Sequence, residues 1–320
     1  GELRGFDIIH LHCPFILGAE MVSLAAALAG TQLVVSYHSD LIRPGNWRDM
    51  IFRLATWSSR LAVMQRADRI LFVSQGHAET SDQRFVYQKR RSHCQVLPNG
   101  VDIHAFRPQA DREQVRKSLH LPLDGRVVGF VAALDSAHHY KGLSVLLQAL
   151  AAQSLKETCL LVVGDGDLKE QYCQQAYDLG ISERVVFYGA AGHETLPSLY
   201  RACDVVTMPS LVAESFGLVV IEALACGVPV VASNGPGVRS LLQHGDNGLL
   251  VEPGNSAALS EAIHQVLQDD ATCQRMGQLG RSNVEERYGW TQIGIRLERI
   301  YQDLRRDFRK QVPMTEQGES

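Results

Sequence analysis

The sequence lacks the features that define several classes of protein. No stretch of its 320 residues approaches the run of about 18 apolar residues that a transmembrane helix needs, so no membrane-spanning helix is predicted. The seven cysteines never stand in CxxC spacing, and Cys159, Cys203 and Cys226 lie in or beside apolar runs. We therefore expect a folded protein of a reducing compartment, the cytoplasm, in which these three cysteines are small buried side chains.

A large excess of charge of either sign is also missing, since the net charge is −4. Residues 1–110 nevertheless carry 12 lysines and arginines against 9 acidic residues, whereas the remainder carries 19 against 26. The basic excess includes Gln88-Lys89-Arg90-Arg91. It has two interpretations, a solvated loop or a peripheral contact of the first part with an anionic membrane surface. No nucleic acid is expected as a partner.

Short β-branched runs alternate with helical stretches along the chain, which is typical of parallel sheets wound with helices. The first part is expected to hold strands at 7–12, 32–37, 69–73 and 93–97, and helices around 18–30, 47–67 and 75–87. The second part is expected to hold strands at 126–132, 159–163, 185–188, 204–208, 229–232 and 248–251, and helices at 142–152, 168–179, 194–202, 217–226, 238–244, 256–268 and 271–287. A last helix over 291–308 has one apolar face that must pack on another element.

Turn residues at Pro98-Asn99-Gly100 and near Pro108 separate the two parts. We predict an α/β fold of two Rossmann-like doubly wound domains facing a cleft. Residues 1–106 form the first, incomplete domain and residues 107–288 form a complete second domain. Residues 289–320 form a helix that crosses back to the first domain, followed by a polar tail. In such sheets ligands bind at the carboxyl ends of the strands.

The strongest local signal is the segment from Glu214 to Glu222, in which two carboxylates are separated by seven residues. A loop after the strand at 204–208 leads into a helix that begins near Gly217. The first free N–H groups of that helix suit a phosphate or a sugar hydroxyl. Both carboxylates have a simpler interpretation as capping or solvating groups. The apolar neighbours of Glu222 argue against it, because a carboxylate in an apolar run usually has a specific partner.

This segment resembles the Glu-x7-Glu motif of the retaining GT-B glycosyltransferases in the large family numbered four, the group 1 transferases. Further segments resemble that family in the same order, at residues 7–12, 37–40, 98–102, 106–108, 163–166, 209–210, 225–232 and 245–251. The resemblance covers nearly the whole chain. It implies the GT-B fold and sugar transfer from a nucleotide-sugar donor, and it is silent on the identity of donor and acceptor.

The resemblance also implies roles for residues. Glu214 contacts the transferred sugar, Lys141 neutralises the donor diphosphate, and His38 reaches the sugar from the first domain. The simpler interpretation of His38 is a histidine at a strand end that bonds its own loop. Glu222 binds the ribose hydroxyls, and the other implied donor-binding residues are Phe216, Gly217, Leu218, Val219 and Gly164.

The implied mechanism stabilises the leaving diphosphate and retains the anomeric configuration, and it needs neither a metal nor a cofactor. The acceptor is expected to be a sugar, a lipid-linked compound or another hydroxyl compound. Asp165-Gly166-Asp167 has the form of a metal motif, but it lies in a glycine turn after a strand. His138-His139 lacks partners at zinc-ligand spacing. The alternatives are a non-catalytic nucleotide-sugar binding protein and a nucleotide-sugar epimerase of the same fold.

Two departures from the family stand out. The arginine usual at the end of the first donor-domain strand is missing, since Val131-Ala132-Ala133-Leu134-Asp135 occupies this stretch. Arg107, His138 and His139 are loose candidates to replace it. The strand and glycine-rich loop with which family members begin are also missing before Asp7. We therefore expect an N-terminally truncated chain with little or no activity of its own.

Overall fold

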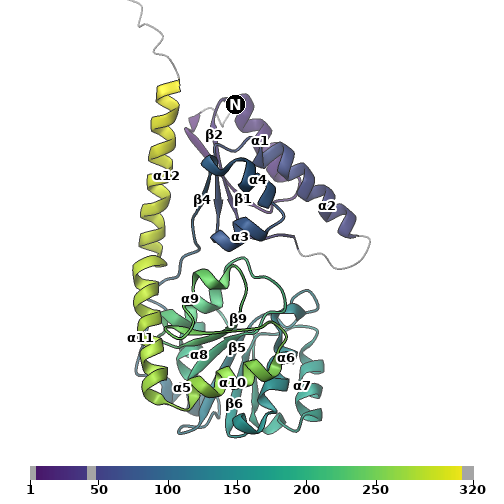
Figure 1. Ribbon diagram of the computed structural model, residues 1–320, viewed down its shortest axis with the longest axis vertical. Helices are drawn as coiled ribbons and strands as arrows, with labels where there is room; N and C mark the ends of the chain where they lie inside the picture. The colour runs from purple at the N-terminus through teal and green to yellow at the C-terminus, as the bar shows by residue number, and fades with distance from the viewer. Residues whose placement is uncertain (1–4, 42–47, 312–320) are drawn as a thin grey trace, which may run out of the picture. The chain divides into compact units, whose positions relative to one another are not determined.

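The computed structural model describes residues 5–41 and 48–311, and its contacts divide the chain into two compact units (Figure 1). The first unit runs to Pro98 and resumes at Thr291, and the second unit is Asn99–Trp290. Residues 99–106, expected in the first domain, belong to the second unit. The reason is that the Val101 N–H donates to the Tyr288 carbonyl at 2.8 Å, and the Arg281 guanidinium donates to the Ile103 and Phe106 carbonyls.

The first unit is built on a four-stranded parallel sheet in the order β1-β2-β3-β4. Its strands are β1 (Ile8–Cys13), β2 (Gln32–Tyr37), β3 (Arg69–Phe72) and β4 (Cys94–Val96), as predicted to within two residues. Every residue of β2 is buried, because a parallel strand is covered on both faces. The helices of this part are α1 (Gly18–Ala29) and α2 (Arg48–Ser59), which continues as a π-helical turn over Arg60–Met64. Trp47, the expected first residue of α2, lies outside the described residues.

The single helix expected over 75–87 is wrong, because the structure has two short helices, α3 (Gln75–Thr80) and α4 (Arg84–Lys89). The backbone at Ser81 is extended, and the Ser81 hydroxyl accepts the Gln83 N–H at 3.3 Å. The Asp82 N–H donates to the Asp40 carboxylate at 3.0 Å. Side-chain acceptors thus replace the helical carbonyl partners and end the helix.

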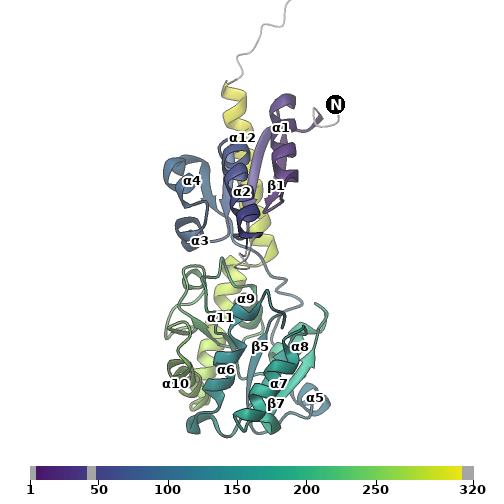
Figure 2. The same cartoon turned by 90° about the vertical axis from the view of Figure 1, so that its right-hand side faces the viewer.

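The last helix, α12 (Trp290–Gln311), packs on the first sheet (Figure 2). Ile300 and Leu304 form one apolar cluster with Val34 of β2 and Leu71 of β3. The Gln32 side chain donates to the Leu304 carbonyl at 3.2 Å. The apolar stripe of α12 therefore completes the core of the first unit. The polar tail over 315–320 lies outside the described residues.

The second unit is a six-stranded parallel sheet in the order β10-β9-β8-β5-β6-β7, with helices on both faces (Figure 1). The strands are β5 (Arg126–Val131), β6 (Thr158–Val163), β7 (Val185–Gly189), β8 (Val205–Met208), β9 (Val230–Ser233) and β10 (Gly248–Val251). The helices are α5 (Arg112–Ser118), α6 (Leu143–Leu150), α7 (Lys169–Asp178), α8 (Leu196–Ala202), α9 (Leu218–Ala225), α10 (Ser256–Leu267) and α11 (Asp270–Arg287). This is the Rossmann strand order, so the predicted fold class is confirmed.

The order of strands places the topological switch between β5 and β8, which are hydrogen-bonded neighbours. After β5 the chain adds β6 and then β7 on one side of β5. It then returns to the other side of β5, where it adds β8, β9 and β10 in turn. The loops that follow β5 and β8 therefore diverge to opposite faces and leave a crevice at the carboxyl edge of the sheet. The candidate site is expected there.

The helix predicted over 238–244 is also wrong, because only the 3-10 turn Val238–Ser240 forms. The side chain of Asn247 accepts the Gln243 N–H at 2.7 Å and donates to the Leu241 carbonyl at 3.1 Å. The side chain of this buried asparagine thus bonds a backbone N–H and a backbone carbonyl that would have other backbone partners in a helix.

The expectation for the cysteines is met only in part, since Cys159 is half-buried and Cys173 is exposed. All seven are free thiols, and Cys203 and Cys226 are buried. Burial raises the pKa of both thiols to about 12, so neither is a thiolate near neutral pH.

None of the helices over residues 5–41 and 48–311 is both long and apolar enough to cross a bilayer.

The burial of His77 lowers the stability of the first unit. The residue is 4% exposed, its ring stacks on Tyr37 at 5.3 Å, and neither ring nitrogen has a hydrogen-bond partner in the described part of the chain. Burial, followed by the charge of His38, lowers its pKa from 6.5 to about 4. As the pH falls from 6.5 towards 4, the unfolded chain therefore binds a proton that the folded chain refuses, and the free energy of unfolding falls.

We predict that His77→Phe stabilises the chain, because an apolar ring of similar shape has no unpaired nitrogens. The expected gain in unfolding free energy is about 1–3 kcal/mol, larger at pH 5 than at pH 8. Thermal melts over this pH range measure it, with the exposed His264→Phe as the control. Melting curves of parent and variant that shift in parallel with pH would contradict the assignment.

Candidate functional site

The loops after β5 and β8 are joined at the carboxyl edge of the second sheet. The Leu211 N–H, after β8, donates to the Tyr140 carbonyl, after β5, at 2.7 Å. Gly142 packs so closely that a Cβ there would lie 2.0 Å from the Pro209 carbonyl oxygen, and its φ is +82°. Only glycine fits both conditions. The chain therefore brings Lys141, one residue earlier, to the switch point.

Lys141 and Glu214 meet at this point. The Lys141 Nζ lies 2.7 Å from the Glu214 Oε1, and the Ser210 hydroxyl donates to the same oxygen at 2.6 Å. The two side chains are 25% and 13% exposed, so solvent reaches the ion pair but screens it only in part. Two of the three residues that the resemblance implies as catalytic thus form one cluster, and Ser210 is a third member that sequence reasoning did not single out.

Helix α9 begins beside this cluster. Gly217 precedes its first residue with a φ of +116°, a backbone conformation that glycine adopts readily. Phe216 is buried and packs edge-to-face on Tyr288 with ring centroids 5.9 Å apart, whereas Leu218 is exposed. The N–H groups of Leu218 and Val219 have no carbonyl one turn earlier within the helix, whereas the Val220 N–H donates to the Gly217 carbonyl at 3.1 Å. They are available to an anion at the end of the helix.

Glu222 lies in the second turn of α9, where its Oε2 accepts a hydrogen bond from the Tyr200 hydroxyl at 2.7 Å. Burial raises the pKa of Glu222, and the Tyr200 hydrogen bond acts in the opposite direction. Burial also raises the pKa of Tyr200 well above its usual value, which keeps the phenol protonated as the donor. Tyr200 holds the carboxylate in one orientation. Sequence reasoning missed it because Tyr200 lies on another helix, α8.

Two further loops reach the same edge of the sheet. Gly164 follows β6, and its N–H donates to the Gly189 carbonyl at 2.8 Å. Gly237, after β9, packs against the Glu214 backbone, where an added Cβ would lie 2.2 Å from the Glu214 carbonyl oxygen. Arg239 follows two residues later and bonds the Asn234 side chain at 2.7 Å. Sequence reasoning missed this cation, and the available signal was an arginine two residues after the turn Gly235-Pro236-Gly237.

Arg107 is one of three candidates to replace the missing arginine, but its position at the amino edge of the sheet rules it out as a group of this site. Its carbonyl accepts a hydrogen bond from Arg201, which ends α8 just before β8 begins. Arg107 therefore lies at the amino edge of the sheet, opposite the site. His138 and His139 lie in the same loop as Lys141, with His138 bonded to Asp135 at 2.7 Å and His139 to the Ser136 carbonyl at 2.8 Å.

His38 belongs to the first unit, at the end of β2. Its N–H donates to the Cys13 carbonyl at 3.0 Å, and its Nε2 lies 2.8 Å from the Nδ1 of His12 on β1. His10 stacks on His12 and is held between the Ser36 and Tyr301 hydroxyls. Burial, followed by the charges of His12 and His38, lowers the pKa of His10 to about 4, so it is neutral near pH 7. The signal for this cluster was the His-x-His pair within the strand at 7–12.

The second unit therefore joins a cation, a carboxylate and a helix start at the carboxyl edge of its sheet, an arrangement that suits an anionic leaving group and a hydroxylated ring. A shared donor pocket for Lys141, Glu214 and Glu222, and the reach of His38 to the donor sugar, stay predictions.

Comparison with known proteins assigns the two parts of the chain to related families. Residues 111–283 match the family described as Glycosyl transferases group 1, and residues 2–105 match Glycosyltransferase Family 4. The chain is 32% identical over 312 residues to D-inositol 3-phosphate glycosyltransferase of Corynebacterium urealyticum, covering 93% of this chain and 72% of that protein. It is 30% identical to phosphatidyl-myo-inositol mannosyltransferase of Mycobacterium leprae, covering 93% and 74%.

Solved structures agree with the sequence matches. Alr3699/HepE of Anabaena, in a complex with UDP-glucose, superposes with a TM-score of 0.78 at 26% identity, covering 94% of this chain and 80% of that one. Sucrose-phosphate synthase of Thermosynechococcus elongatus superposes with a TM-score of 0.76 at 27% identity, covering 94% and 74%. With its Rossmann strand order and the Lys141–Glu214 cluster at the switch point, the chain belongs to the glycosyl transferases group 1 family and is a glycosyltransferase of the GT-B fold.

Proposed function

We propose that the protein transfers a hexosyl group from a nucleoside diphosphate sugar to a hydroxyl acceptor, with retention of the anomeric configuration and without a metal ion. The observation that carries the proposal is the Lys141–Glu214 ion pair beside the start of α9, at the crevice where α/β sheets bind nucleotides. The UDP-glucose and UDP complexes of the Anabaena relative support a nucleotide-sugar donor.

The reaction breaks the bond between the sugar C1 and the diphosphate oxygen, and the acceptor oxygen forms a new bond to C1 on the same face. The acceptor proton passes to the departing diphosphate, so the atoms and charges balance without an external base. Negative charge grows on the diphosphate as the bond breaks, and Lys141 and the N–H groups at the start of α9 stabilise it there. Arg239 is the additional cation that we place near this charge, in the loop that packs against Glu214.

Lys141 serves two partners in this proposal. An ammonium group has three donors, so Lys141 keeps Glu214 in place while it binds a phosphate oxygen. Lys141 and Ser210 both bond Oε1 of Glu214, which leaves Oε2 to accept hydroxyls of the transferred sugar. Glu222, held by Tyr200, accepts the ribose hydroxyls. The site thus divides into a charge-stabilising part and a hydroxyl-binding part.

The names of the relatives guide the choice of acceptor. Two of them act on an inositol phosphate or a phosphatidylinositol, so we propose a hydroxyl-rich acceptor, either phosphorylated or lipid-linked.

A lipid-linked acceptor requires contact with a membrane surface. On α2, Leu54 and Trp57 are exposed beside the exposed Arg53, which suits an anionic bilayer. Sedimentation with vesicles of phosphatidylglycerol, compared with neutral phosphatidylcholine, tests this contact.

The function is tested with UDP- and GDP-hexoses and myo-inositol phosphate as the probe acceptor. NMR of the product is expected to show the donor's anomeric configuration, and EDTA is expected to leave the rate unchanged. An inverted product or a rate restored only by added metal would overturn the respective part of the proposal. Donor binding without turnover would favour the non-catalytic binding protein, and an epimerised sugar would favour the epimerase.

Substitutions at Lys141 and Glu222 separate transition-state stabilisation from binding. Glu222→Ala is expected to raise the donor KM with little change in kcat, because the ribose is bound equally in the ground and transition states. Lys141→Ala is expected to lower kcat by roughly a hundredfold, since its partner gains charge only as the bond breaks.

Steady-state kinetics with varied donor measure both effects. The exposed Lys156→Ala, at the amino edge of the sheet, is the matched control and is expected to change neither constant. An effect of Lys141→Ala on KM alone would rule out leaving-group stabilisation by this residue.

A further inference from the structure

One face of the first sheet carries a line of histidines that ends at His38. Side chains alternate between the two faces of a strand, so His10 and His12 of β1 share a face. The pairing of β1 with β2 places His12 opposite Ser36, and His38 follows two residues later on the same side. This is the face on which α12 packs, since the Tyr301 hydroxyl of α12 lies 2.6 Å from the His10 Nδ1.

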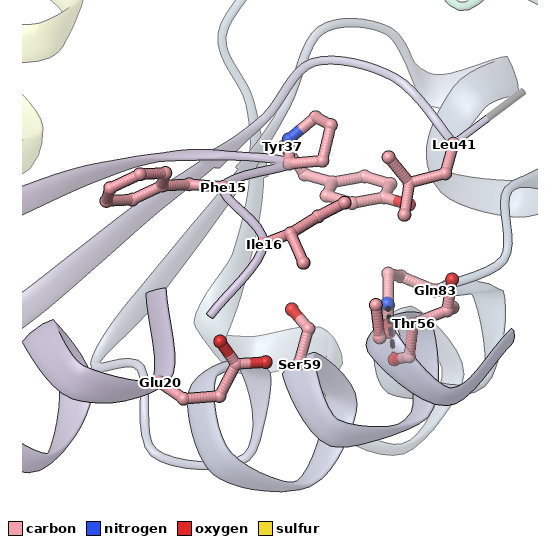
Figure 3. A pocket seen from close by; sticks show the side chains of 10 residues that line it. Phe15, Ile16, Glu20, Tyr37, Leu41, Thr56, Ser59 and Gln83 are labelled. Carbon is pink, nitrogen blue, oxygen red and sulfur yellow. Dashed lines mark hydrogen bonds between the residues drawn. The ribbon is translucent and has the colours of Figure 1, made fainter. Parts of the chain in front are cut away.

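The opposite face of the sheet is turned to α1 and α2. Tyr37, which lies between Ser36 and His38 in the chain, points to that side and lines the hollow shown in Figure 3 together with residues of α1 and α2. Because successive residues of a strand point to opposite faces, the sheet separates this hollow from the histidines. The histidines therefore form a group of their own on the side of α12.

His12 and His38 are joined ring to ring. The Nδ1 of His12 lies 2.8 Å from the Nε2 of His38, and the two ring planes differ by 6°. A hydrogen bond between two neutral imidazoles needs a proton on one nitrogen and a lone pair on the other, so each ring is held to one tautomer. The bond thus decides which nitrogen of His38 carries its proton, and it fixes the plane of that ring.

His10 supports this pair from the side. Its ring stacks on the His12 ring with the centroids 4.5 Å apart. Both of its nitrogens are bonded, Nδ1 to the Tyr301 hydroxyl at 2.6 Å and Nε2 to the Ser36 hydroxyl at 2.8 Å. The ring cannot turn without breaking two hydrogen bonds, so it holds the neighbouring His12 ring in place. A chain of contacts therefore runs from α12 to His38.

The three rings are not arranged around a metal ion. Over residues 5–41 and 48–311, no three side chains of His, Cys, Asp or Glu are placed to hold one. Both nitrogens of His10 bond hydroxyl groups, and His12 and His38 each turn one nitrogen to the other. The hydrogen bonds among these side chains thus order the rings directly.

We propose that His12 is a positioning residue of the sugar transfer, which fixes the ring plane and the tautomer of His38. The proposal rests on the proposed function, because the family resemblance places His38 at the transferred sugar. A histidine beside a reacting sugar is effective when the correct nitrogen is turned to it, and a misplaced group lowers the rate of reaction. His12 acts through His38 and needs no contact with the donor itself.

Substitutions of the exposed His12 test this role in the full chain. His12→Phe keeps a ring but removes Nδ1, and it is expected to lower kcat about tenfold with little change in the donor KM. His12→Asn keeps a polar group at the position of Nδ1 and is expected to recover most of that rate. In a His38→Ala background, His12→Phe is expected to cause no further loss, because the residue that it positions is gone.

Nitrogen-15 NMR of the histidine rings gives a second measurement, which needs no activity. At pH 8, where unperturbed imidazoles are neutral, the parent and His12→Asn are expected to show one tautomer of His38. His12→Phe is expected to show a mixture of both tautomers. The matched control is the exposed His264→Phe, which is expected to change neither kcat nor the His38 signals.

An unchanged kcat together with an unchanged His38 tautomer in His12→Phe overturns the positioning role. A further loss of kcat on adding His12→Phe to His38→Ala also overturns it, because His12 would then act on the substrate by itself. A parent chain that transfers no sugar refutes the proposed function, whereas the NMR spectra of the same samples still decide whether His12 fixes the His38 ring.

Discussion

The second unit depends on a buried ion pair between Arg116 and Asp204. Arg116 is 1% exposed, and its guanidinium donates to the Asp204 carboxylate at 2.7 Å and to four backbone carbonyls. The other carboxylate oxygen pairs with Arg112, and the Val127 N–H donates to Asp204 at 2.7 Å. Loss of either partner would leave a buried charge alone, which is strongly destabilising. The pair therefore fixes the starts of β5 and β8 side by side.

A second ion pair, between Lys141 and Glu214, lies at the opposite edge of the sheet, where β5 and β8 end. Because β5 and β8 are hydrogen-bonded neighbours, the loops that follow them start side by side at the carboxyl edge before they diverge, and Lys141 and Glu214 meet there. The structural pair at the amino edge is almost fully buried, whereas the pair at the carboxyl edge is partly exposed to solvent. Burial keeps Arg116 and Asp204 paired with each other. The partial exposure of Lys141 leaves room for a further anion beside it.

The polar groups of the candidate sites differ in how completely they are paired. Glu222 has Tyr200, and Glu214 has Lys141 and Ser210, so these carboxylates are oriented before a donor arrives. Preorganised groups stabilise developing charge without reorganising. In the first unit, the Glu20 Oε2 and the Gln83 Oε1 are buried and have no hydrogen-bond partner among the residues that the structure describes.

The sequence alone determined the strands, the doubly wound architecture of the second unit and the family, because β-branched runs, glycine turns and the Glu-x7-Glu spacing are local patterns. It did not determine the breaks at Ser81 and near Asn247, where side chains replace helical hydrogen bonds. Only the tertiary structure decided the partners of the site residues. Tyr200 meets Glu222, and Ser210 with Lys141 meets Glu214, because separate helices and loops converge at one edge of the sheet. Such convergence is fixed by strand order and packing, which no spacing within the sequence records.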